Sequence, residues 1–158
     1  LMADTLPWPA EPLDIVDVGS GAGLPGLLLA LRHPDSQVTS LETVAKKITF
    51  QGEAARSLGL KNFHPVRRNV FEFAQGDGRH RFDVMTARAF AALKDLLPLA
   101  ADLLRPGGEL WAYKGAQAAA EEAAVPSAAL EGYAPVQRHS YRFDSADWSG
   151  VILVYRKR

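Results

Sequence analysis

Short apolar runs alternate with longer amphipathic stretches along most of the chain. The apolar runs have the length and the branched side chains of buried strands, and they lie around residues 15–18 and over 37–42, 62–67, 82–87 and 109–113. The stretches between them predict helices over 24–32, 44–58 and 93–104, followed by an alanine-rich helix over 116–131 interrupted near Pro126. Strands that alternate with helices predict a mainly parallel sheet covered on both faces.

The C-terminal part has a different pattern. Residues 136–143 and 151–155 read as two strands, and the loop between them is too short for a crossover helix. We therefore expect them to pair antiparallel at the edge of the sheet. A terminal hairpin of this kind distinguishes methyltransferases from flavodoxin-like and dinucleotide-binding folds.

The predicted helix over 44–58 has an apolar face that we expect to be buried. Its members are Val44, Ile48, Ala55 and Leu58, and Gly59 is the expected stop.

The composition predicts one globular domain. The chain of 158 residues is long enough to bury roughly 70 % of its unfolded surface, and no apolar run reaches the ~20 residues that span a bilayer. We assign residues 13–158 to this domain and residues 1–12, with three prolines, to an extended lead-in held by Leu6 and Trp8. No cysteine is present, which excludes disulfides and thiolate zinc sites, and the four histidines lack metal-ligand spacing. We expect a cytoplasmic monomer without a metal.

The segment DVGSGAGLPG joins the first strand to the first helix. Glycines at 19, 21 and 23 allow positive φ angles and let a ligand approach the backbone. The dinucleotide pattern G-x-G-x-x-G fits only from Gly21, too far from the end of the strand. An acid at Asp17 would repel a pyrophosphate but suits the ammonium and sulfonium of S-adenosylmethionine (SAM). A turn that needs glycine only for its geometry is the alternative.

Three further residues lie where predicted strands end. Glu42 follows Gly19 by 23 positions, close to the ~20 expected of an acid that binds ribose hydroxyls, although a solvated acid fits as well. Phe71 would stack on an adenine or belong to the core beside Phe73. Arg88 would face the transferable methyl group or form a surface salt bridge.

The residues also narrow the reaction. Because the chain has no cysteine, it cannot form the covalent adduct that methylation of a pyrimidine carbon requires. The chain also lacks the Asn/Asp-Pro-Pro-aromatic motif, and this absence speaks against an exocyclic amine as the methyl acceptor. A ring nitrogen such as guanine N7 needs only to be positioned, and positioning can lower the activation barrier by ~7–11 kcal/mol. Four basic residues follow predicted strands at the edge of the sheet where SAM is expected to bind. They form a candidate track for RNA phosphates: Lys46, Lys47, Arg88 and Lys114.

The sequence resembles the RsmG (GidB) family, which methylates guanine N7 in 16S small-subunit rRNA. The resemblance is carried by DVGSGAGLPG, LETVAKK, RAFAAL and YKG, and it covers nearly the whole chain from Asp4. It implies a class I SAM-dependent methyltransferase (Rossmann-like) α/β fold: a mainly parallel seven-stranded sheet with a C-terminal antiparallel hairpin and helices on both faces. It also implies 16S rRNA or the assembling small ribosomal subunit as partner.

The family's functional positions carry over residue by residue. The implied cofactor-binding residues are Gly19, Leu24, Val70, Phe71 and Arg88, to which the strand-end analysis adds Asp17, Gly21, Gly23 and Glu42. Arg88 and Lys114 are the predicted catalytic residues, and Lys46, Lys47 and Lys114 are the predicted RNA contacts.

Two departures stand out. The family usually has an acid where Phe71 stands, and it carries extra helices before the point at which this chain begins, so that residues 1–12 resemble the remnant of that region. Two other functions stay open: a small-molecule SAM-dependent methyltransferase, favoured by the zero net charge, and an RNA-binding domain with a degenerate cofactor pocket.

Overall fold

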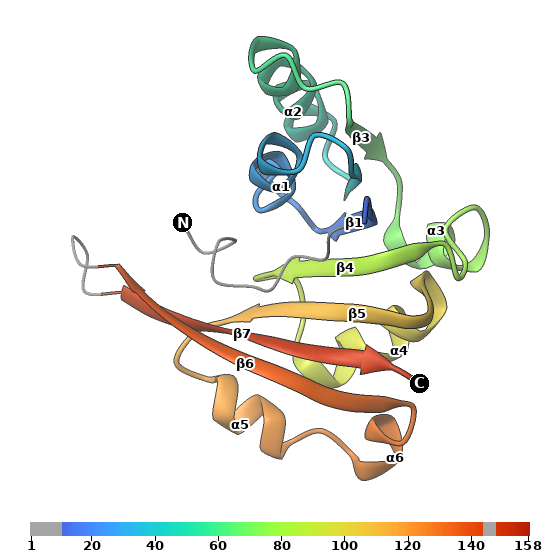
Figure 1. Ribbon diagram of the computed structural model, residues 1–158, viewed down its shortest axis with the longest axis vertical. Coiled ribbons are helices and arrows are strands. Elements are labelled where there is room, and N and C mark those ends of the chain that lie inside the picture. The colour runs from blue at the N-terminus through green and yellow to red at the C-terminus, as the bar shows by residue number, and fades with distance from the viewer. Residues whose placement is uncertain (1–10, 144–147) are drawn as a thin grey trace.

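A computed structural model describes residues 11–143 and 148–158, and its described strands form a single seven-stranded sheet (Figure 1). The strands are β1 (Asp14–Val18), β2 (Gln37–Glu42), β3 (Phe63–Arg67), β4 (Phe82–Arg88), β5 (Leu104–Lys114), β6 (Tyr133–Phe143) and β7 (Trp148–Lys157). Their order is β3-β2-β1-β4-β5-β7-β6, and β7 runs antiparallel to both of its neighbours. The predicted α/β fold with a C-terminal antiparallel hairpin is confirmed. The predicted lead-in, with Leu6 and Trp8, lies almost wholly outside the described residues.

Helices pack against both faces of the sheet, and each face has its own core. Helices α1 (Gly26–Arg32) and α2 (Ala45–Ser57) contribute to one core, while α3 (Val70–Gln75), α4 (Leu93–Leu103), α5 (Ala118–Ala123) and α6 (Ser127–Leu130) contribute to the other. Successive side chains of β5 point to opposite faces of the sheet, so this strand contributes to both cores: Trp111 packs in the first and Ala112 in the second.

Helix α4 shows why the predicted pattern folds as it does. Its buried residues recur at helical spacing, so one continuous apolar stripe meets the sheet: Leu93, Leu96, Leu97, Leu99, Ala100 and Leu103. Each fully buried leucine contributes about 1.5–3 kcal/mol of transfer free energy, which is far more than helix propensity supplies.

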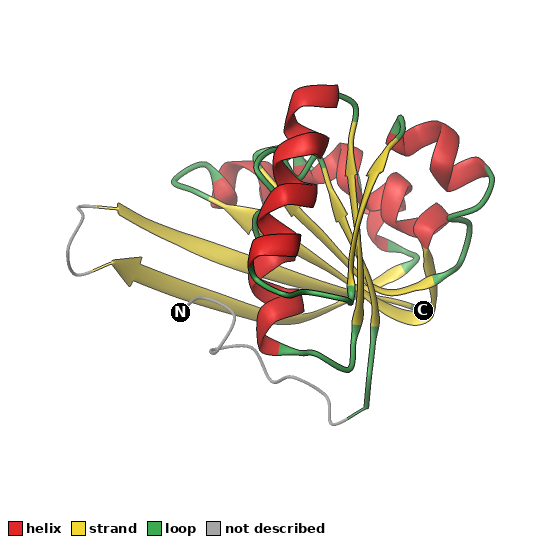
Figure 2. Ribbon diagram, turned by 90° about the horizontal axis from the view of Figure 1, so that it is seen from above, coloured by secondary structure: helices red, strands yellow, loops and turns green. Residues whose placement is uncertain are grey.

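The predicted hairpin is longer than the sequence indicated. Strands β6 and β7 pair from Tyr133 and Lys157 to Phe143 and Trp148, and they extend beyond the other strands of the sheet (Figure 2). Within the described part of the chain, no helix has the length and hydropathy needed to cross a membrane.

Three local features of the structure differ from the prediction. Helix α1 begins at Gly26 rather than residue 24, and β5 begins at Leu104, five residues early, through an irregular stretch that includes Gly107. Helix α3 was not predicted, although Asn69 is a recognisable N-cap whose side chain accepts from the backbone N–H of Phe71.

The predicted apolar face of α2 is only partly confirmed. Ala55 is buried and Ile48 is half-buried, but Val44 is 45 % exposed and Leu58 is 51 % exposed. The second residue that α2 buries, Gln51, was not predicted. The polar pattern of this helix is too even to indicate which side meets the sheet.

Candidate cofactor and acceptor site

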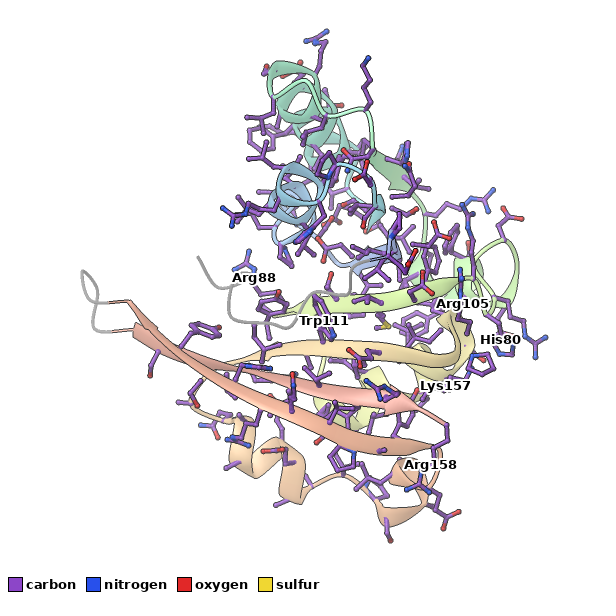
Figure 3. The ribbon with its side chains drawn as sticks, in the orientation of Figure 1. His80, Arg88, Arg105, Trp111, Lys157 and Arg158 are labelled. Atoms are coloured by element: carbon purple, nitrogen blue, oxygen red, sulfur yellow. The ribbon has the colours of Figure 1, made fainter. Side chains whose placement is uncertain are left out.

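The predicted site residues lie where β1, β2, β4 and β5 end, because parallel strands bring their carboxyl ends to the same edge. Figure 3 shows Arg88 at this end of the sheet and Arg105 at the opposite end. The segment from Gly19 to Gly23, here called the glycine loop, connects β1 to the turn before α1.

The three glycines of this loop all have positive φ, but their surroundings differ. At Gly19 (φ +60°) a Cβ atom would lie 2.2 Å from the Phe90 ring, and at Gly23 (φ +88°) it would lie 2.7 Å from the Leu27 side chain. At Gly21 (φ +60°) a Cβ atom would meet nothing within 4 Å. Two glycines therefore permit close packing within the protein, and the third leaves open space above the backbone.

Asp17 is fully buried near the end of β1 and ties the start of α1 to β4. One carboxylate oxygen accepts from the backbone N–H of Gly26 at 2.9 Å, and the other accepts from the Thr86 hydroxyl at 2.8 Å. Burial raises the pKa of Asp17 to about 6, against the lowering effects of these two hydrogen bonds and of the Arg88 charge. Both oxygens are thus bonded within the protein, and the predicted direct contact with a cofactor ammonium stays a prediction.

Glu42, at the end of β2, faces the glycine loop. Its Oε2 accepts from the backbone N–H of Gly21 at 3.1 Å and lies 3.4 Å from the Lys47 ammonium, while its Oε1 accepts from the N–H groups of Thr43 and Val44. Burial raises the pKa of Glu42, but these N–H groups and Lys47 lower it more, so the pKa lies below its ordinary value. An ionised carboxylate therefore lies beside the open backbone of Gly21.

The other predicted cofactor contacts differ in their surroundings. The Leu24 carbonyl accepts from Arg88 Nε at 3.4 Å, which joins the end of the glycine turn to the end of β4. Val70 is buried in the core at the start of α3, whereas Phe71 is 59 % exposed, so the alternative that placed Phe71 in the core is wrong.

A pocket of about 620 Å³ opens beside Arg88, between the loop after β4 and the hairpin. Its lining is rich in rings and charges: Arg88, Ala89, Phe90, Ala91, Ala92, Tyr113, Lys114, Gly115, Gln117, Glu121 and Tyr141. The buried Tyr113 hydroxyl has no hydrogen-bond partner among the described residues, and burial, with the nearby Asp17 charge, raises its pKa above the ordinary value. This pocket is here called the acceptor pocket, after the predicted position of Arg88 facing the transferable group.

Lys114 is largely buried and fixes the wall of the acceptor pocket. Its side chain is 7 % exposed, and its ammonium lies 2.7 Å from Glu121 Oε2 and donates to the Ala91 carbonyl at 2.6 Å. The same Glu121 oxygen accepts from the Leu93 backbone N–H at 2.8 Å. In this arrangement Lys114 orders the segment between β4 and α4, and its predicted contact with RNA stays a prediction. Lys46 and Lys47 lie exposed at the start of α2.

Replacing Lys114 with alanine is expected to lower the free energy of unfolding by about 1–3 kcal/mol, because the Ala91 carbonyl and Glu121 lose a buried partner. Urea denaturation measures this change. Lys46→Ala is the matched control: an exposed lysine on the same edge, for which we expect a change within about 0.5 kcal/mol. Equal stability of the two variants would contradict the assigned role of Lys114.

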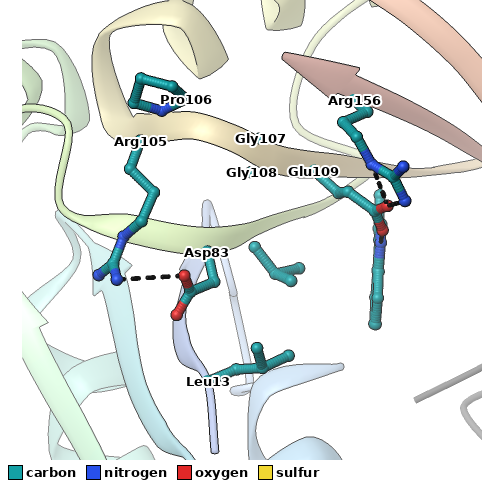
Figure 4. A pocket seen from close by; sticks show the side chains of 10 residues that line it. Leu13, Asp83, Arg105, Pro106, Gly107, Gly108, Glu109 and Arg156 are labelled. Carbon is teal, nitrogen blue, oxygen red and sulfur yellow. Dashed lines mark hydrogen bonds and ion pairs between the residues drawn. The ribbon is translucent and has the colours of Figure 1, made fainter. Parts of the chain in front are cut away.

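A second pocket, of about 480 Å³, lies at the opposite end of the sheet (Figure 4). Its charges are paired within the protein, with Arg105 3.2 Å from Asp83 and Arg156 2.7 Å from Glu109. No glycine-loop residue lines it. Among the described residues, no group of three or more His, Cys, Asp or Glu side chains is arranged to hold a metal ion.

Sequence reasoning missed a cluster of three buried polar residues at the glycine loop. Ser20 of the loop is hydrogen-bonded with Ser40 of β2 and Gln51 of α2. A buried polar residue in the middle of a mostly polar helix leaves no signal in the hydropathy pattern.

Solved structures with a similar fold include one that is named as a predicted methyltransferase. A predicted O-methyltransferase from Agrobacterium tumefaciens superposes with a TM-score of 0.76 at 17 % identity, covering 99 % of this chain and 79 % of that chain. P. horikoshii TYW2 in complex with MeSAdo superposes with a TM-score of 0.70 at 14 % identity, covering 92 % of this chain and 57 % of that chain. At these identities the likeness shows the fold.

Sequence relatives are more informative. "Ribosomal RNA small subunit methyltransferase G" of Chromohalobacter salexigens is 46 % identical over 112 residues, covering 71 % of this chain and 52 % of the relative. The protein of the same name from Azoarcus sp. is 40 % identical over 122 residues, covering 77 % and 56 %. The chain thus spans about half the length of the curated relatives it matches. The sequence profile of GidB, described as rRNA small subunit methyltransferase G, matches residues 8–140, and the chain belongs to this family.

Proposed function

We propose that this protein transfers a methyl group from SAM to N7 of a guanine in 16S rRNA. Membership of the GidB family supports the reaction class, and the open backbone of Gly21 beside the ionised Glu42 is the observation that carries the cofactor assignment. The assembling small subunit is the proposed partner.

The residues at the edge of the sheet fit SAM. The bare backbone at Gly21 admits a close ligand, and Glu42 offers an ionised carboxylate for two ribose hydroxyls. The exposed Phe71 ring offers a stacking surface for adenine. Gly19, Gly23 and Leu24 would shape the remaining wall.

The chemistry demands little of the protein besides positioning. SAM supplies a methyl group on a positively charged sulfur, and guanine N7 presents a free lone pair without needing a base. Arg88 would orient the RNA by contacting a phosphate or a base edge, while Phe90 and Tyr113 would line the space for the purine. The ion pair of Lys114 with Glu121 would keep this wall in place.

Transfer of radiolabelled methyl groups tests the proposal, with naked 16S rRNA and assembled small subunits as acceptors. We expect labelling at guanine N7, and Arg88→Ala should reduce it at least about tenfold, because a charge-assisted contact is lost. Arg79→Ala, an exposed arginine before β4 at the opposite end, should leave the rate unchanged. Preference for NAD over S-adenosylhomocysteine in calorimetry would overturn the cofactor assignment.

A small-molecule acceptor is the second candidate, because the net charge of zero gives the chain no overall attraction for RNA. Methyl transfer to a small purine at a rate that RNA does not exceed would favour it. Tight RNA binding without affinity for S-adenosylhomocysteine would instead indicate an RNA-binding domain.

A further inference from the structure

One buried glutamine ties helix α2 to the glycine loop. Gln51 has no exposed surface, and its Nε2 donates to the Gly21 carbonyl and to the Ser20 hydroxyl oxygen, both at 2.8 Å. Its Oε1 accepts from the Ser40 hydroxyl at 2.8 Å, and the hydroxyl oxygens of Ser40 and Ser20 lie 2.6 Å apart. The three side chains therefore close a ring of hydrogen bonds that links α2, β2 and the loop.

The Gly21 carbonyl fixes the orientation of the Gln51 amide. A carbonyl oxygen only accepts, so the NH₂ group of Gln51 must face it, and the amide oxygen must then face Ser40. Rotation of the amide by 180° would bring its oxygen against the Gly21 carbonyl oxygen, with no proton between them. The ring thus has a single consistent orientation of the amide.

Gly21 is held from two sides by this arrangement. Its N–H donates to Glu42, and its carbonyl accepts from Gln51. Glu42 is the proposed ligand of the ribose, so its bond to Gly21 must be shared with a bound cofactor. The hydrogen bond from Gln51 reaches the Gly21 carbonyl from the side of α2. Because Gln51 is fully buried, a cofactor does not enter on that side, and this hydrogen bond can persist when SAM binds.

We propose that Gln51 is a positioning residue for the cofactor: it holds the Ser20–Gly21 backbone in its binding conformation before SAM arrives. The inference rests on the proposed function, since it assumes that the glycine loop receives SAM. A loop ordered in advance loses less conformational entropy on binding, so the amide contributes to affinity without touching the ligand.

The test compares Gln51→Met, which keeps the length of the side chain but removes its amide, with Asn62→Leu. Asn62 is a matched control, because its buried Nδ2 lies 2.9–3.1 Å from the carbonyl oxygens of Ala30, His33 and Ser36, away from the glycine loop. For Gln51→Met we expect about tenfold weaker binding of S-adenosylhomocysteine and faster hydrogen exchange at Gly21 and Gly23 in the ligand-free protein. In methyl transfer, KM for SAM should rise while KM for rRNA stays constant. Asn62→Leu should change none of these by more than about twofold.

The outcomes separate the inference from the proposed function. Wild-type affinity in Gln51→Met, or equal losses in both variants, overturns the positioning role. If Gln51→Met does not fold, Ser40→Ala replaces it as the test variant, because it removes the hydrogen bond from Ser40 to the Gln51 amide oxygen. For Ser40→Ala we expect about threefold weaker binding of S-adenosylhomocysteine and faster hydrogen exchange at Gly21. Unchanged binding and unchanged exchange in this variant overturn the proposal. Failure of the wild-type protein to bind S-adenosylhomocysteine contradicts the proposed function. In that case, hydrogen exchange at Gly21 in the ligand-free wild-type and Gln51→Met proteins still shows whether Gln51 orders the loop.

Discussion

Replacing Gly19 with alanine is expected to weaken cofactor binding strongly and to lower the free energy of unfolding by about 2–5 kcal/mol. Two costs add. An alanine at φ +60° costs about 1–2 kcal/mol, and its Cβ atom would lie 2.2 Å from the Phe90 ring, an overlap that costs about 1–3 kcal/mol to relieve. Because relief moves Phe90 or the loop itself, we expect binding of S-adenosylhomocysteine to weaken about a hundredfold or more. Urea denaturation and calorimetry measure the two effects.

Gly59→Ala separates these costs. Gly59 has φ +68°, a Cβ atom there would meet nothing within 4 Å, and the residue lies after α2, away from the glycine loop. The variant should lose only the backbone contribution of about 1–2 kcal/mol and bind the ligand normally. A Gly19→Ala protein no less stable than Gly59→Ala, with normal affinity, would show that the packing of Phe90 on the loop is unimportant.

The buried Asp17 is expected to make the protein less stable as the pH rises from about 4.5 to 6. The folded protein retains the Asp17 proton up to a pKa of about 6, whereas the unfolded chain releases it near 3.8. The folded state therefore binds more protons in this window, the free energy of unfolding falls as pH rises, and it is level above the folded pKa. The shift corresponds to about 3 kcal/mol over the full interval. Urea denaturation at closely spaced pH values measures the slope.

Asp17→Asn is the control, because it keeps the shape and cannot ionise. Its amide oxygen can accept from the Gly26 N–H, and its NH₂ group can donate to the Thr86 hydroxyl, which then donates to the Val16 carbonyl. We expect this variant to lose the slope. Glu42 does not obscure the effect, since its lowered pKa acts below its ordinary value of 4.5 and with the opposite sign. The same slope in both proteins would assign the pH dependence to other groups.

The fold and the outline of the site could be predicted because they depend on periodicity and strand ends. Gly19, Glu42 and Arg88 each lie at or just after the end of a buried strand, so their meeting at one edge follows from parallel pairing. What hydropathy does not encode is which way a polar side chain turns. Asp17 points inward to Gly26, and Lys114 is buried against Glu121, although both types of residue are usually solvated.

Helix α2 also shows that hydropathy alone does not predict which side chains are buried. The apolar residues at its two ends, Val44 and Leu58, lie exposed, and its contact with the glycine loop is made by a glutamine. Binary patterning fails where a hydrogen-bonded ring replaces an apolar contact, because polar residues that satisfy one another are indistinguishable in sequence from polar residues that face water.

The position of β7 has a consequence for biogenesis. This strand follows β6 in the chain yet lies between β6 and β5, so a nascent polypeptide that has not yet released it exposes the full hydrogen-bonding edge of β5. Unpaired strand edges can pair with strands of other chains. Translational pausing or early termination before Trp148 would therefore leave an aggregation-prone intermediate. Assembly of the side of the sheet that carries Tyr113 and Lys114 therefore awaits the emergence of β7 from the ribosome.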